Sequence, residues 1–89
     1  MTGCIYKLSS ELGNCCYIGK TCYTRRILRL YQHRYEFRIQ RYYYSSFEVL
    51  KFPDVIFEII KDDIPIRDLH MEERLEMKNH PNSVNIYLN

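Results

Sequence analysis

The 89-residue chain contains no tryptophan, only three glycines and three prolines, and no long apolar run. This composition, with 46% apolar residues, excludes collagen-like, low-complexity and disordered chains. The longest apolar run, from Val55 to Ile60, is interrupted by Glu58 and is too short to span a bilayer. No signal-peptide run follows Met1. We therefore expect a small soluble intracellular domain, cytoplasmic or nuclear, with no membrane partner.

Cysteine is the next feature that bears on protein class. A count of four is compatible with a secreted disulfide framework, but the missing signal peptide and the sufficient apolar content favour reduced thiols. A zinc site is the other reading, yet the spacings of these cysteines and His33 match none of the usual ligand patterns. The cysteines are Cys4, Cys15, Cys16 and Cys22.

Charge is unevenly distributed along the chain, although the net charge is only +2. Between positions 20 and 45, seven basic residues, six of them arginine, stand against Glu36 alone, whereas positions 46–89 carry five basic and nine acidic residues. Tyrosines are interleaved with these arginines, as on a surface that contacts phosphates and offers rings for stacking. A solvated helix face is the alternative that charge alone leaves open.

The local pattern predicts a β-hairpin followed by a helix. Residues 4–8 and 15–19 are β-prone and flank a turn in which Gly13 and Asn14 tolerate positive φ. Thr24 is the expected N-cap of a helix over positions 25–37. In this helix we expect Arg29 and His33, one turn apart, to face solvent. The expected core face comprises Ile27, Leu28, Leu30, Tyr31 and Tyr35.

The second half of the chain is predicted to contain one further strand and a last helix. Positions 45–50 fit either a short helix or an irregular loop. Residues 54–60 are rich in β-branched side chains and apolar on both faces, which predicts a strand covered by helices. Pro65 suits an early position of a helix that continues to about Lys78.

Glu73 is the most informative residue of the last helix. Ile66, Leu69 and Met77 form an apolar stripe, and Glu73 lies in the middle of it. An unpaired buried charge costs several kcal/mol, so this carboxylate is expected to meet an arginine, a hydrogen-bond network or a metal ion. A structural ion pair or a half-exposed position is the alternative. Glu72 and Arg74 point away from the stripe and are expected to be solvated.

Taken together, the motifs resemble those of GIY-YIG nuclease domains. Positions 3–6 (GCIY) correspond to the first motif, and positions 17–21 (YIGKT) follow after a ten-residue interval. The match is completed by an Arg-x-x-x-His pair (Arg29 and His33), by Glu73 and by Asn85, and it covers nearly the whole chain. Cys4 occupies the usual glycine position and Gly3 precedes it, which departs from the family pattern.

The resemblance implies a fold and an activity. The fold is α+β, with a small three-stranded antiparallel sheet flanked by helices in the order β-β-α-α-β-α, as the local pattern also predicts. Residues 1–89 would form a single catalytic domain without a separate DNA-specificity domain. The activity is hydrolysis of a DNA phosphodiester with one Mg²⁺ or Mn²⁺ ion.

The resemblance also assigns roles to individual residues. Glu73 would be the single metal ligand, Arg29 would stabilise the pentavalent phosphorane, and Tyr6 would be the general base. For this purpose the phenol pKa would have to be lowered by metal-bound water, Arg29 and Lys20. Tyr17, His33 and Lys20 would assist.

DNA, duplex or branched, is the expected partner. Substrate specificity is expected to be low, or to come from a homodimer or from a separate protein. Because one active site cuts one strand, a clean double-strand break would need two copies. Two alternatives stay open: a catalytically weak or inactive nucleic-acid-binding module, and a nuclease for RNA or branched DNA. The residues expected to contact DNA are Arg25, Arg26, Arg34, Arg38, Arg41 and Asn85.

Overall fold

The central strand, β1, organises the fold of this α+β domain. In the computed structural model, which describes residues 2–22, 26–40 and 43–85, β2 and β3 pair with β1 on either side, both antiparallel. The predicted order β-β-α-α-β-α is confirmed. The elements are β1 (Thr2–Ser10), β2 (Cys15–Cys22), α1 (Arg26–Ile39), α2 (Phe47–Leu50), β3 (Ile56–Pro65) and α3 (Ile66–Asn79).

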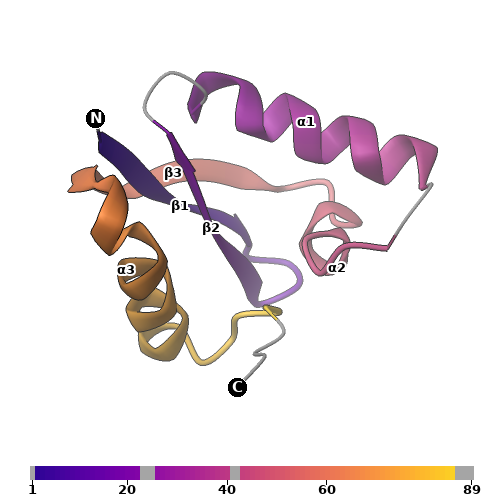
Figure 1. The fold of residues 1–89 in the computed structure, drawn as a ribbon. Helices are drawn as coiled ribbons and strands as arrows, with labels where there is room; N and C mark the ends of the chain where they lie inside the picture. Colours follow the sequence, from indigo (N-terminus) through magenta and orange to yellow (C-terminus); the bar gives the residue numbers. More distant parts are fainter. Residues whose placement is uncertain (1, 23–25, 41–42, 86–89) are drawn as a thin grey trace.

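Helices cover both faces of the sheet, so the core has two halves (Figure 1). Successive side chains of a strand point to opposite faces, and β1 accordingly supplies both halves. Ile5 packs with Leu69 of α3, whereas Tyr6 and Leu8 pack with Phe47 of α2. These three β1 side chains are fully buried. The strand that carries the first motif therefore lies in the centre of the core, with side chains buried on both of its faces.

Most of the predicted helices and strands are present, and several are longer than predicted. The hairpin strands are longer than predicted, and in the turn between them Asn14 alone has a positive φ, of 47°. Positions 47–50 form the short helix rather than a loop. Pro65 precedes the first turn of α3. The predicted N-cap Thr24 lies outside the described residues.

The prediction that helices cover both faces of the third strand is confirmed only in part. Ile64 packs in the half of the core that contains Leu69 of α3, and Phe57 packs in the half that contains Phe47 of α2. β3 is an edge strand: Ile56 is 62% exposed and Glu58 is exposed as well. The reason is topological, because β1 separates β3 from β2 and takes the doubly covered central position. Apolar residues on both faces of a strand do not show which strand of a sheet is central.

Two further expectations concern cysteines and membranes. All four cysteines lie in the described part of the chain, and no disulfide joins them. Among the residues with described structure, no helix has the length and apolar character needed to cross a membrane.

Candidate active site

The candidate site is built around the side chain of Tyr6 on the central strand. Its ring is fully buried and stacks on Phe57 of β3 with 5.1 Å between ring centroids. Gly19 is the direct partner of Tyr6 on β2, and a Cβ atom at that position would collide with the phenol ring. The glycine of the second motif therefore makes room for the tyrosine of the first.

The Tyr6 hydroxyl is held by two residues of α1. Its oxygen lies 2.6 Å from Nε2 of His33, and it accepts hydrogen bonds from Nη2 of Arg29 at 3.1 Å and from Nε of Arg29 at 3.3 Å. Nη1 of Arg29 donates to Gln32 at 2.9 Å, which orients the guanidinium. Residues from a strand and a helix, 23 and 27 positions apart, thus converge on one oxygen.

The direction of each hydrogen bond follows from the chemistry of the partners. A guanidinium has only donors, so the Tyr6 oxygen accepts from Arg29 and its own proton points to Nε2 of His33. Burial and the nearby Arg29 lower the pKa of His33 to about 4, so the imidazole is neutral and can accept this proton. Nδ1 then carries the imidazole proton and donates to Oγ of Ser46 at 3.2 Å.

The protein's own groups around Tyr6 raise the pKa of its phenol overall, although Arg29 acts in the expected direction. Burial raises the pKa of this phenol, the proximity of Tyr17 raises it further, and Arg29 opposes both. Burial also raises the pKa of Tyr17. Lys20, the other residue expected to lower the Tyr6 pKa, forms an ion pair with Glu73. Tyr6 is therefore a neutral phenol at pH 7, with a neutral imidazole as its proton acceptor.

The predicted orientation of α1 was wrong. His33 is 8% exposed and Arg29 faces Tyr6, whereas Tyr31 and Tyr35 are 69% and 53% exposed. The physical reason is that the Tyr6 hydroxyl offers the polar side chains hydrogen bonds inside the protein, while Leu30 packs against the same core. Leu28, also predicted to be buried, is exposed.

Glu73 faces inward, as its place in the apolar stripe predicted. It is 8% exposed, and its Oε1 lies 3.1 Å from Nζ of Lys20, which belongs to the second motif on β2. The carboxylate is also close enough to raise the pKa values of Tyr6 and Tyr17. The pair Lys20–Glu73 therefore belongs to the same electrostatic environment as the tyrosines.

The carboxylates Glu72 and Glu76 of α3 share one basic partner, Lys61. Glu72 was expected to be solvated, but it accepts a hydrogen bond from Nζ of Lys61 at 2.7 Å and is only partly exposed. Glu76 is 9% exposed and lies 3.2 Å from the same ammonium. The edge strand β3 supplies Lys61, so the sequence of α3 alone could not reveal this pairing.

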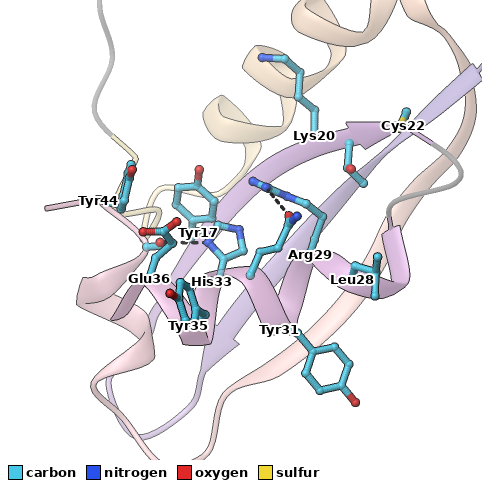
Figure 2. A pocket seen from close by; sticks show the side chains of 13 residues that line it. Tyr17, Lys20, Cys22, Leu28, Arg29, Tyr31, His33, Tyr35, Glu36 and Tyr44 are labelled. Atoms are coloured by element: carbon cyan, nitrogen blue, oxygen red, sulfur yellow. Dashed lines mark hydrogen bonds between the residues drawn. The ribbon is translucent and has the colours of Figure 1, made fainter. Parts of the chain in front are cut away.

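A groove of about 830 Å³ gives solvent access to this centre. Tyr17, Arg29 and His33 lie next to one another in it, as Figure 2 shows, and Lys20 also lines it. Tyr17 packs edge-on against His33, with 5.4 Å between ring centroids. Five of the six predicted catalytic residues contact one another or line this groove, and Glu73 is connected to them through its ion pair with Lys20.

The structure describes only some of the residues that were expected to contact DNA. Arg34 and Arg38 are exposed on α1. Arg25 and Arg41 lie outside the described residues, and only the backbone of Arg26 is described.

Asn85 has a structural role in the described chain. Its side chain accepts a hydrogen bond from the Ile18 backbone N–H at 2.8 Å and donates one to the Ile18 carbonyl at 2.7 Å. Ser83 donates a further hydrogen bond to the same amide at 2.6 Å. The Asn85 side chain thus replaces a neighbouring strand at the edge of β2, and we assign it to the fold instead of to a DNA contact.

Two members of the site were not predicted from the sequence. Ser46 is 1% exposed and orients His33, and Gln32 orients Arg29. Gln32 is three residues from Arg29 on a predicted helix, a spacing that could have identified it. Ser46 follows another serine in a segment with no clear periodicity, and no signal in the sequence indicates its partner.

Comparisons of the chain with models of protein families, with curated proteins and with solved structures found no match.

Proposed function

We propose that the protein is a metal-dependent endonuclease of the GIY-YIG kind, which hydrolyses phosphodiester bonds of DNA. The observation that carries this proposal is the convergence of Arg29 and His33 on the Tyr6 hydroxyl, at 3.1 and 2.6 Å. All three residues belong to the motifs that resemble this family, and the groove exposes two of them to a substrate.

In the proposed reaction Tyr6 relays a proton rather than storing a negative charge. When the bound phosphate draws an N–H of Arg29 away from the Tyr6 oxygen, that oxygen is free to accept a proton. Water then attacks the phosphorus atom and gives a proton to the Tyr6 oxygen, while Tyr6 passes its own proton to Nε2 of His33. The bond from phosphorus to the leaving deoxyribose oxygen breaks, and that oxygen takes up a proton from solvent. The neutral state of His33 supports this step, because only an unprotonated Nε2 can accept. The hydrogen bond from His33 to Ser46 keeps the ring in the required orientation.

Arg29 would stabilise the negative charge that grows on the phosphate oxygens during attack. Its guanidinium is oriented by Gln32 and by Tyr6 and lines the groove, so it needs little rearrangement to meet a phosphate. A planar guanidinium offers paired donors to a phosphate, which a lysine cannot do.

Glu73 is the residue proposed to hold Mg²⁺ or Mn²⁺. Its buried carboxylate already binds a cation, the ammonium of Lys20, and a carboxylate oxygen is the ligand these ions prefer. Among the described residues no cluster of three or more His, Cys, Asp or Glu exists, so substrate phosphate and water would complete the ligand shell. When bound, the ion supplies Lewis-acid polarisation of the phosphate.

The experiment that tests this function is a plasmid-nicking assay. Purified protein is incubated with supercoiled plasmid plus Mg²⁺ or Mn²⁺, and with EDTA as the metal-free reference. We expect nicked circles to form first, since one site cuts one strand, and only when metal is present.

Two variants of α3 make the assay specific. Glu73→Gln removes the proposed ligand and should abolish cleavage, whereas Glu72→Gln, which affects the adjacent ion pair with Lys61, should leave cleavage within about threefold. Circular dichroism checks that both variants are folded. Undiminished metal-dependent nicking by folded Glu73→Gln protein would refute the assignment, and binding without cleavage by the wild type would favour an inactive nucleic-acid-binding module.

A further inference from the structure

The exposed face of α1 carries aromatic side chains that the proposed chemistry does not use. Tyr31 is 69% exposed and Tyr35 is 53% exposed. They are four residues apart and therefore lie one above the other along the helix. Large rings at this exposure contribute little to the core, which α1 contacts through Leu30 and Phe37.

These tyrosines line the same groove as the candidate active site. Tyr44, 43% exposed and located before α2, lines the groove as well. Figure 2 shows the side chain of Tyr31 directed away from those of Arg29 and His33, with Tyr35 next to His33. The aromatic rings thus begin beside the reactive centre and continue outward along α1.

The charges on this face of α1 favour a nucleic-acid strand over a second copy of the chain as the partner. Arg34 and Arg38 are exposed and lie three and seven residues from Tyr31, so they share its side of α1. They lie beside the groove and do not line it, whereas Glu36 is the acidic residue in its lining. Rings alternating with guanidinium groups suit a nucleic-acid strand, whose phosphates meet the arginines while its bases stack on the rings. A second copy of the chain placed symmetrically on this face would bring like charges together.

We infer that Tyr31, Tyr35 and Tyr44 form a stacking surface for unpaired bases next to the phosphate that is cut. The bases of a duplex stack on each other, so only unpaired bases can offer their faces to these rings. This inference rests on the proposed nuclease function and names its substrate class: DNA with single-stranded bases at the cleavage position.

Binding measured in EDTA tests the stacking surface separately from cleavage. Fluorescence anisotropy compares a single-stranded oligonucleotide with the matched duplex. Combined Tyr31→Ala and Tyr35→Ala substitutions should weaken single-strand binding at least about tenfold and duplex binding less than about threefold. Tyr31→Phe with Tyr35→Phe keeps the rings and should bind like wild type. Met71→Ala with Leu75→Ala, exposed positions of α3, is the matched control.

A second binding test uses oligonucleotides that lack individual bases. Replacing bases one at a time by abasic sites should weaken binding of the wild type at the stacked positions, and should have no such effect on the double alanine variant. Equal behaviour of the two proteins, equal losses on duplex and single strand, or a dimer that the alanine substitutions dissociate would overturn the inference.

Cleavage of the same strands with Mn²⁺ separates this inference from the proposed function. A protein that binds single strands through the tyrosines but leaves every phosphodiester intact would refute the nuclease and keep the stacking surface. A nuclease whose double alanine variant binds and cuts all strands like wild type would refute the stacking surface alone.

Discussion

The Tyr6 hydroxyl oxygen and Nε2 of His33 are 2.6 Å apart, with the phenol on the central strand and the imidazole on the helix that covers it. Burial raises the pKa of Tyr6 and lowers that of His33, so both groups are neutral at pH 7. The hydrogen bond therefore joins two neutral groups, with Tyr6 as donor and His33 as acceptor. The proton would pass from Tyr6 to His33, and charge would be separated, only when the reaction proceeds.

Tyr6→Phe should abolish the proposed proton relay while keeping the ring in the core. We expect a loss in cleavage rate of about 10²-fold to 10⁴-fold, the usual range for general acid–base catalysis. Loss of the hydroxyl also leaves Nε2 of His33 without this partner and should lower the free energy of unfolding by about 1–3 kcal/mol. Single-turnover cleavage and urea denaturation measure the two effects. Tyr43→Phe, which removes an exposed hydroxyl bonded to Glu48, is the matched control.

Acid should destabilise the fold through His33. The folded pKa of about 4 lies below the ordinary value of 6.5, so the unfolded chain binds the proton first as pH falls. The contribution to stability is complete above about pH 6.5 and declines toward pH 4, by at most about 1.4 kcal/mol per pH unit. Urea denaturation at pH 7 and pH 5 measures this change. The His33→Gln variant should lack it, and identical pH profiles for both proteins would contradict the prediction.

Arg29→Lys should slow cleavage about 10²-fold or more, comparable to the loss of one preorganised donor in a transition state. The guanidinium of Arg29 uses three nitrogens to reach Tyr6 and Gln32, and a lysine ammonium cannot reproduce this fork. Rates at saturating DNA test the change, with Arg38→Lys on the same helix as control. A loss below about threefold would transfer the role to Arg25 or Arg26.

Asn85→Ala should weaken the fold without weakening DNA binding. The substitution leaves the backbone N–H and C=O of Ile18 without the side-chain partner that holds them, at a cost of about 1–3 kcal/mol. Thermal unfolding and binding to duplex DNA are measured together, with Asn82→Ala as control because its hydrogen bonds are longer. A large loss of affinity in a protein of unchanged stability would restore Asn85 to the DNA-contacting residues.

The salt dependence of DNA binding should show whether the arginines between positions 20 and 45 contact phosphates. Combined Arg38→Ala and Arg41→Ala should flatten the dependence of log K on log salt by about two, because each phosphate neutralised on duplex DNA contributes about 0.9. Cleavage at saturating DNA should stay within about threefold.

A charge-matched control for this experiment is available on α3. Arg67→Ala with Lys78→Ala removes the same charge from exposed positions of another helix and should leave the slope unchanged. Normal binding of the Arg38 and Arg41 variant at every salt concentration would show that these arginines do not track the phosphate backbone.

Structural features that depend only on residues close together in the sequence were predicted well. The order of strands and helices follows from β-branched runs, turn residues and helix boundaries, and each of these signals spans only a few positions. The inward position of Glu73 was predictable for the same reason, since an apolar stripe at helical spacing places one face of α3 in the core. Its partner Lys20, 53 positions away, was not.

The orientation of α1 and the edge position of β3 were decided by the tertiary structure. Apolar content favoured burying Tyr31 and Tyr35, but the Tyr6 hydroxyl from a distant strand satisfies Arg29 and His33 inside the protein and leaves the tyrosines outside. Hydrogen bonds between elements can outweigh a hydrophobic pattern within one element, because a hydrogen bond to a partner offsets the cost of desolvating a buried polar group. The amino-acid sequence thus determined the elements and the chemical groups of this protein, and packing of the elements against β1 determined which of those groups meet.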